Sequence, residues 1–181
     1  MICRVRARSM GVGHLLRYLF GPGELGEHDE PRLVGAWPWA AVGGVAGLGP
    51  AAGVSVGRLS RLLEQPVVAG IRPPRRPVWH CSVHNHPADR ILSDDQWGSI
   101  AAEFVAAVGV APSDDPGGAR WVAVRHADEH VHIVATLVRQ DGPTVWARND
   151  YRRCQSLARE LERRLGLHLL CTNDGALIGD R

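Results

Sequence analysis

The sequence has no apolar run long enough to cross a membrane, which takes about 20 residues. Its longest weakly polar stretch, residues 36–57, is interrupted repeatedly by glycine and proline. The N-terminal stretch MICRVRARSM carries charges at alternate positions, where a signal peptide needs an apolar core. We therefore expect a cytoplasmic protein that does not insert into membranes.

Lysine is also absent, so all 21 basic residues are arginines, and the formal net charge is only +2. Such a small charge does not by itself indicate a nucleic-acid partner. Arginine nevertheless pairs with phosphate through two parallel hydrogen bonds and stacks on bases. The four cysteines are scattered and form no CxxC pair, which argues against a disulfide framework and against a thiolate zinc site.

The length of 181 residues, 45% of them hydrophobic, fits a single domain over 1–181 with an irregular Gly/Ala-rich segment around 36–57. Apolar residues alternate in some stretches and recur at helical spacing in others. The pattern predicts strands over 1–9, 78–85, 120–126 and 130–139, and helices over 12–20, 56–65, 93–110 and 149–165. Because the last two strands form a hairpin, we expect an α+β fold with a central, mainly antiparallel sheet and flanking helices.

The stretch RHADEHVHIV, residues 125–134, contains His126, His130 and His132. Alternate residues of a strand share a face, so His130 and His132 point the same way, and the short hairpin connection brings His126 across from them. Three neutral imidazoles can hold a divalent ion and leave coordination positions open for catalysis. The alternative is three exposed polar residues on the wet face of a strand, but their clustering favours the metal site.

Three further residues are candidates for supporting such a site. Asp128 could orient one ligand by accepting its second N–H, or could be an ordinary turn residue. His80 and His84 share one face of the strand 78–85. They are candidates for a second shell around the metal or for substrate contact, with plain surface positions as the alternative.

Three blocks of the sequence resemble plasmid mobilisation relaxases of the HUH endonuclease superfamily. HADEHVHIV resembles the three-histidine motif, LLRYLFGPGELGEHDEPRLVGAW the N-terminal segment that carries the relaxase tyrosine, and VWHCSVHNHPADRILSDDQW the strand-and-helix block that follows. The resemblance extends from about Met1 to Leu170. The commoner relaxase pattern has one more residue between the acidic position and the HxH pair, and this departure concerns the geometry of His126.

The resemblance implies an HUH relaxase-like fold and a metal-dependent DNA relaxase. Such an enzyme nicks and rejoins single-stranded DNA at an origin of transfer through a 5′-phosphotyrosine intermediate and so initiates conjugative mobilisation. Its partners would be that DNA, auxiliary relaxosome proteins and a coupling protein, and its metal Mn or Mg, with Zn, Co or Ni as alternatives. Two other functions stay open: a rolling-circle replication initiator, which usually carries its tyrosine after the histidines, and a non-catalytic, metal-stabilised DNA-binding module.

The nucleophile must then be one of only two tyrosines, Tyr18 and Tyr151. Tyr18 lies off the apolar stripe of the helix 12–20, whereas Tyr151 lies near the apolar side of the last helix, where we expect it to pack. We therefore assign the catalytic role to Tyr18, against the alternative of a tyrosine at the rim of an amphipathic helix. A free phenol, with a pKa of about 10, needs a metal or a proton acceptor for activation. The acceptors nearby in sequence are His14, Glu24, Glu27 and His28.

Arginines recur along the last predicted helix. Arg152, Arg159 and Arg163 fall at i, i+7 and i+11 and would form one stripe that follows DNA phosphates. The alternative is a solvated face with local ion pairs such as Glu160 with Arg164.

Overall fold

The computed structural model describes residues 1–23, 30–37 and 54–170, and its centre is a five-stranded sheet. The strand order is β1-β3-β5-β4-β2, and every neighbouring pair is antiparallel. The strands are β1 (Ile2–Val5), β2 (Arg32–Ala36), β3 (Val78–His84), β4 (Ala119–Ala127) and β5 (His130–Arg139). The central strands β3, β5 and β4 are mostly buried on both faces because helices cover both sides.

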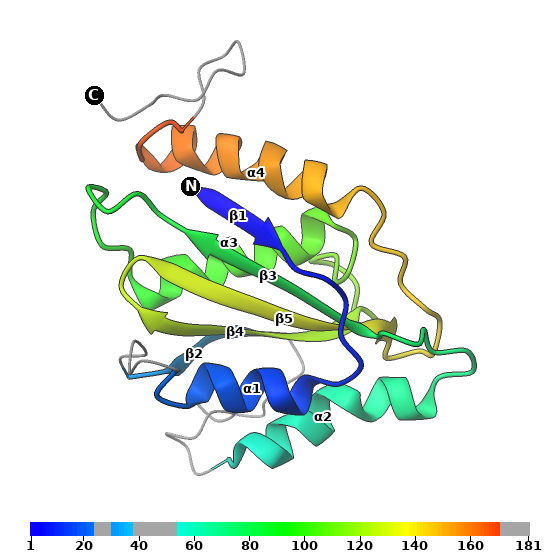
Figure 1. Cartoon of the computed structure of the whole chain (residues 1–181). Coiled ribbons are helices and arrows are strands. Elements are labelled where there is room, and N and C mark those ends of the chain that lie inside the picture. The colour runs from blue at the N-terminus through cyan, green and yellow to red at the C-terminus, as the bar shows by residue number, and fades with distance from the viewer. Residues whose placement is uncertain (24–29, 38–53, 171–181) are drawn as a thin grey trace.

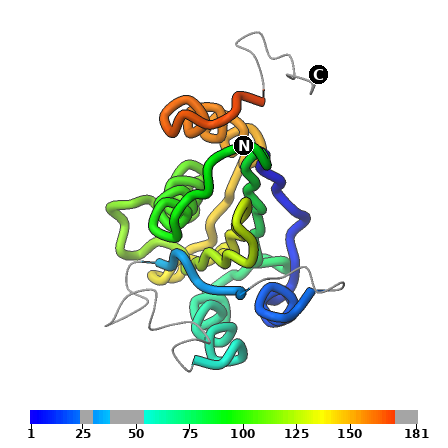
Figure 2. The backbone as a smooth tube through the Cα atoms, turned by 90° about the vertical axis from the view of Figure 1, so that its left-hand side faces the viewer, coloured from blue at the N-terminus to red at the C-terminus, as the bar shows by residue number. Residues whose placement is uncertain are grey.

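Two helices lie on each face of the sheet (Figures 1 and 2). They are α1 (Val12–Phe20), α2 (Val56–Ala69), α3 (Asp94–Ala107) and α4 (Asp150–Leu165). The Thr136 hydroxyl of β5 donates to the Leu63 carbonyl of α2, at 3.2 Å, on the face that α1 and α2 cover. On the other face, the Arg125 guanidinium of β4 reaches Asp94 at the start of α3.

The helix α3 is fixed tightly against the sheet. The Ser93 hydroxyl accepts from the Gln96 N–H, and the Gln96 side chain accepts from the Ser93 N–H, which together form a capping box. Farther along, a Cβ atom at Gly98 would lie 2.2 Å from the Val34 carbonyl oxygen. Glycine at this position therefore allows the close approach of α3 to β2 and so places Asp94 beside β4.

The α+β fold with a mainly antiparallel sheet is confirmed, and four details of the prediction are corrected. The strand β2 was not predicted, because Gly35 and the neighbouring loop-like composition hide its short alternation. The helix α2 continues through Pro66 to Ala69, beyond the predicted end at residue 65. The last helix begins at Asp150 and not at residue 149, because Asn149 has a left-handed backbone (φ 56°) and makes no side-chain cap.

The fourth correction concerns the segment around 36–57 that was predicted to be irregular. Most of it, 38–53, lies outside the described residues. Its edges are regular, since Ala36 ends β2 and Val56 and Gly57 begin α2. Among the residues that the structure describes, no helix has the length and apolarity that a membrane span requires.

Candidate metal centre

Five histidines from three adjacent strands gather on the sheet face that α1 and α2 cover. In β3 and β5, Ser82 pairs with His132 and His84 pairs with His130, so these side chains share that face. A bulge in β4 shifts the register between Arg125 and Ala127 and leaves His126 on the same side. The five are His80, His84, His126, His130 and His132.

Three of these histidines are close enough to hold one metal ion. His126, His130 and His132 each offer a ring nitrogen, and the three nitrogens lie within 4.8 Å of one another. Their ring centroids are 4.5 Å (126–130), 4.8 Å (126–132) and 5.4 Å (130–132) apart. Nitrogens bound at about 2.1 Å in tetrahedral geometry lie about 3.4 Å apart, a separation that small ring rotations would reach. This chain has one residue fewer than the commoner relaxase pattern between the acidic position and the HxH pair. His126 nevertheless lies close to His130 and His132.

The surroundings of the three nitrogens also fit a bound cation. His80 Nε2 lies 2.9 Å from His132 Nδ1. If His132 donates from Nδ1, its Nε2 keeps a lone pair for a metal, and His80 acts as the outer partner that metal-ligating histidines usually have. Glu129 Oε1 lies 3.3 Å from His130 Nδ1 and plays the same role for that ring. The buried Ser82 hydroxyl, opposite His132, has no hydrogen-bond partner among the described residues.

Asp128 does not accept from a histidine in the structure, contrary to the first of the two roles weighed for it. Its carboxylate accepts from Arg125 Nη2 at 3.1 Å. Arg125, only 3% exposed, also donates to the Ala127 and Asp128 carbonyls and to Asp94 Oδ1 at 2.5 Å. Arg125 thus fastens the β4–β5 turn to α3 and holds the backbone between His126 and His130 in place.

Three of the clustered histidines, His132, His80 and His84, are held in the neutral form that a metal ligand requires. Burial, followed by the positive charge that the neighbouring imidazoles can carry, lowers the pKa of His132 to about 2. Burial, followed by the Arg6 charge, lowers the pKa of His80 to about 4, and burial with His130 and Arg4 lowers that of His84 to about 4. Metal binding at neutral pH would therefore not have to displace protons from these rings.

The depressed pKa values predict a pH-dependent stability for the metal-free protein. His80 and His84 titrate near 6.5 when unfolded and near 4 when folded, so the unfolded chain binds protons first. Their contribution is present above pH 6.5 and is lost as the pH falls towards 4, at no more than about 1.4 kcal/mol per pH unit for each ring. Urea unfolding in EDTA at successive pH values should show this loss. A His80→Gln/His84→Gln variant with an equally steep loss would contradict the assignment.

The two tyrosines lie on opposite sides of the sheet. Tyr18 is near the C-terminal end of α1, on the helix side away from the buried residues Val12, Leu16 and Leu19, and is 44% exposed. That end of α1 and the β4–β5 turn lie at the same end of the sheet (Figure 1). Tyr151 begins α4, which packs on β1 and α3. The prediction that Tyr151 packs against the core is wrong, since Tyr151 is 59% exposed.

Residues 67–167 match the family model described as Relaxase: MobA/VirD2-like, nuclease domain. The chain belongs to this relaxase family. The matched range contains all five clustered histidines, whereas Tyr18 lies outside it, and the family implies nuclease activity. Searches of the curated proteins and of the solved structures gave no match.

Two arginines of the relaxase were missed as site residues by the sequence reasoning. Arg4 on the edge strand β1 and Arg6, directly after its end, are exposed, and their charges lower the pKa values of His84 and His80. The sequence did contain a pattern that indicates these two residues, because Arg4, Arg6 and Arg8 alternate with apolar residues, as side chains on one face of a strand do. Of the sequence neighbours considered as proton acceptors for Tyr18, only His14 is described; Glu24, Glu27 and His28 lie outside the described residues.

The expected arginine stripe on α4 is interrupted. Arg159 Nη2 donates to the Met1 carbonyl and lies 3.0 Å from the buried Glu162 carboxylate, which also pairs with the Met1 amino group. Arg152 and Arg163 are exposed, with no ion pair to a described residue. The Glu160–Arg164 pair of the alternative interpretation is present at 3.7 Å. The three arginines thus do not form one exposed surface.

We expect Arg159→Gln to lower the free energy of unfolding by about 1–3 kcal/mol, because the buried Glu162 carboxylate loses an ion-pair partner and the Met1 carbonyl loses a donor. The Arg152→Gln/Arg163→Gln variant should stay within about 0.5 kcal/mol of the wild type, since both side chains are exposed. Urea unfolding measures both. If these two arginines bind DNA phosphates, their removal should also flatten the salt dependence of DNA affinity. Equal stability of the two variants would show that Arg159 is not structural.

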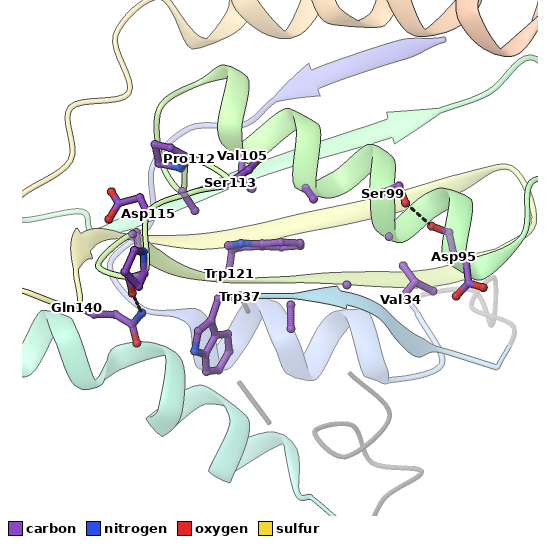
Figure 3. A pocket seen from close by; sticks show the side chains of 18 residues that line it. Val34, Trp37, Asp95, Ser99, Val105, Pro112, Ser113, Asp115, Trp121 and Gln140 are labelled. Carbon is purple, nitrogen blue, oxygen red and sulfur yellow. Dashed lines mark hydrogen bonds between the residues drawn. The ribbon is translucent and has the colours of Figure 1, made fainter. Parts of the chain in front are cut away.

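An apolar hollow beside α3 is not part of the histidine site. This cavity of about 440 Å³ lies between α3, β2 and β4 and is lined by Val34, Trp37, Val105 and Trp121, among others (Figure 3). Its lining includes no histidine, and Asp95 and Asp115 are its acidic residues. The chemistry of the relaxase is therefore to be sought on the opposite sheet face.

Proposed function

We propose that this relaxase nicks and rejoins single-stranded DNA at an origin of transfer, with Tyr18 as the nucleophile and a 5′-phosphotyrosine as the intermediate. The single observation that carries the proposal is the convergence of His126, His130 and His132 within 4.8 Å on one sheet face. That convergence within a relaxase nuclease domain favours an active catalytic centre over a purely structural one.

In this proposal His126, His130 and His132 hold a divalent cation. The bound ion would polarise the scissile phosphate and stabilise the charge that develops on its oxygens. Imidazole ligands suit Mn, Co, Ni or Zn better than Mg, but availability in the cell selects Mn or Mg as the expected occupants. His80 and Glu129 orient the rings of His132 and His130 through their outer nitrogens.

The proposed transesterification exchanges one phosphodiester bond for another, so the number of these bonds does not change. The Tyr18 hydroxyl oxygen attacks the phosphorus, the bond from phosphorus to the 3′ oxygen breaks, and that oxygen takes up a proton. The phenol proton passes to an acceptor on the protein side. Because a phosphotyrosine ester replaces the DNA ester, the 3′ hydroxyl can attack it and reverse the step, which allows rejoining after transfer.

The surface around the site supports a DNA strand as substrate. Arg4 is exposed on β1, the strand that pairs with the histidine-bearing β3, and Arg6 is exposed directly after the end of β1. Arginine guanidinium groups at this edge can hold the phosphates that flank the scissile one. Arg125 stays buried in its ion pairs and serves the β4–β5 turn instead.

The biological setting follows from the same proposal. Nicking at an origin of transfer would start conjugative mobilisation in the cytoplasm, with auxiliary relaxosome proteins and a coupling protein as partners. We treat residues 1–181 as one nuclease domain, in which α1 supplies the tyrosine and the hairpin of β4 and β5 supplies the metal ligands.

The test is incubation of the whole chain with a 5′-labelled and a 3′-labelled single-stranded origin DNA in Mn²⁺, followed by denaturing electrophoresis. A 5′-phosphotyrosine link transfers only the label on the 3′ fragment to the protein band. Binding without any covalent band, in Mn²⁺ or Mg²⁺, would favour the non-catalytic DNA-binding module. Cleavage that needs a tyrosine after the histidines would favour a replication initiator.

A further inference from the structure

A second hollow, which is basic, lies at the end of the sheet opposite the histidines. It has a volume of about 640 Å³, and four of its ten lining residues are arginines: Arg8, Arg75, Arg76 and Arg148. None of the ten is acidic. A hollow of this composition has an excess of positive charge and no internal carboxylate to neutralise it.

The hollow and the histidine site are joined by one strand. His130 and His132 begin β5, whereas Leu137, near its end, lines the hollow. At about 3.4 Å per residue the two places are roughly 20 Å apart along β5. Figure 1 shows the β4–β5 turn at one end of the sheet and the connections that enter β3 and α4 at the other.

The aromatic member of the hollow is Trp146, whose side chain is 70% exposed. An exposed tryptophan is costly to leave in water and is enriched at binding sites. Its segment is nevertheless held in place, because the Val145 N–H donates to the Leu137 carbonyl at 2.9 Å and the Arg148 N–H to the Trp146 carbonyl at 2.7 Å. Met10, 77% exposed, adds a second apolar surface beside it.

The arginines of the hollow are available for an anionic ligand. Within the described part of the chain, Arg75, Arg76 and Arg148 form no ion pair and no side-chain hydrogen bond. Arg8 pairs with Asp150 at 2.5 Å, and its Nη1 has no hydrogen-bond partner among the described residues. Arg75 and Arg76 are flanked by Pro74 and Pro77, which restrict the backbone that carries them.

We propose that this hollow is a second contact for single-stranded DNA, in which a base stacks on Trp146 and the neighbouring phosphates bind Arg75, Arg76 and Arg148. Positive grooves with an aromatic platform bind single strands in this manner with little sequence preference. A protein partner would need a carboxylate-rich surface to match Arg75, Arg76 and Arg148, whereas a DNA strand supplies one charge per nucleotide. The inference rests on the proposed action on single-stranded DNA and extends that strand beyond the scissile phosphate.

The test measures DNA binding by the whole chain in EDTA, so that neither metal nor cleavage contributes. The probe is a fluorescein-labelled oligothymidylate of about 20 nucleotides, longer than a usual single-strand site of about 4–16. Fluorescence anisotropy gives the Kd of the wild type and of Trp146→Ala, Trp146→Phe and Arg75→Gln/Arg76→Gln over a range of salt concentrations. The matched control is Arg58→Gln/Arg61→Gln, which removes the same charge from exposed positions on α2.

We expect Trp146→Ala to weaken binding about tenfold and Trp146→Phe to retain most of the affinity, because the ring supplies the stacking surface. The Arg75→Gln/Arg76→Gln variant should reduce the slope of log K against log salt by about 1.4, the value for two phosphates of a single strand. If Trp146→Ala and Arg75→Gln/Arg76→Gln bind the oligothymidylate no more weakly than the control does, the inference is wrong. A protein partner would then be the better candidate for this surface.

The covalent assay in Mn²⁺ separates this inference from the proposed function. Trp146→Ala should need about tenfold more DNA than the wild type to form the same amount of tyrosine adduct, because Trp146 contributes to binding the strand and not to the reaction at the histidines. A wild-type protein that forms no adduct but binds DNA through Trp146 would refute the proposed chemistry and support the second contact. An active protein whose DNA affinity is indifferent to Trp146 would refute the second contact alone.

Discussion

Replacing His130 and His132 together by alanine should lower the affinity for Mn²⁺ by more than about 100-fold and abolish DNA cleavage. Loss of an outer partner of a metal ligand alone typically costs about 10–100-fold in affinity, and this variant removes two ligands. Each single variant should also lose cleavage, because two nitrogens cannot fix an ion against a phosphate. Isothermal calorimetry with Mn²⁺ and the nicking assay measure the two effects.

A matched control is available in a second pair of histidines. His86 and His168 stack with ring centroids 4.5 Å apart, and neither belongs to the three proposed ligands. The His86→Ala/His168→Ala variant removes the same number of imidazoles and should bind Mn²⁺ as the wild type does. Calorimetry that finds unchanged affinity in the His130→Ala/His132→Ala protein would refute the ligand assignment.

The outer partners give a graded version of the same test. His80→Gln removes the ring that lies 2.9 Å from His132 Nδ1, so we expect a loss of about 10–100-fold in Mn²⁺ affinity. Asp128→Asn should have a smaller effect, since Asp128 pairs with Arg125 and not with a ligand. If Asp128→Asn instead lowers the Mn²⁺ affinity more than His80→Gln does, Asp128 would be the residue that orients a ligand.

The clustering of the histidines was predictable because strand periodicity is strict. Residues at i and i+2 of a strand share a face, so the sequence alone placed His130 on the same face as His132, and His80 on the same face as His84. The relative register of β3 and β5 was not predictable, since the chain between them is long and contains α3. Only the observed pairing of Ser82 with His132 brings His80 beside the proposed ligand His132.

The errors have equally local causes. The acidic residues of the β4–β5 turn could not be assigned from spacing, because Arg125 reaches Asp128 across the bulge and leaves Glu129 for His130. Arg159 was placed on an outer stripe because helical periodicity gives an angle around the axis but not the position of a neighbouring chain end. The Met1 carbonyl and Glu162 draw that side chain inward.

Replacing Tyr18 by phenylalanine should eliminate the covalent DNA adduct while the fold, Mn²⁺ affinity and single-strand binding persist. The variant removes only a hydroxyl from a side chain that is 44% exposed, so little packing is lost. The hydroxyl is also the only atom of that side chain that can form a phosphate ester. The matched control is Tyr151→Phe, which removes the same atom from the other tyrosine of the chain.

The placement of the two helices makes this pair of variants decisive. The helix α1 contacts β4 and β5, the strands that carry the three proposed ligands, whereas α4 contacts β1 and α3 and covers the other face. A phenol on α4 would have to reach around the sheet edge to meet a phosphate held at the histidines, so Tyr151→Phe should form the adduct at the wild-type rate. Abundant adduct with Tyr18→Phe, lost in Tyr151→Phe, would show that the strand is attacked from the α4 side and that the histidine face does not carry the chemistry.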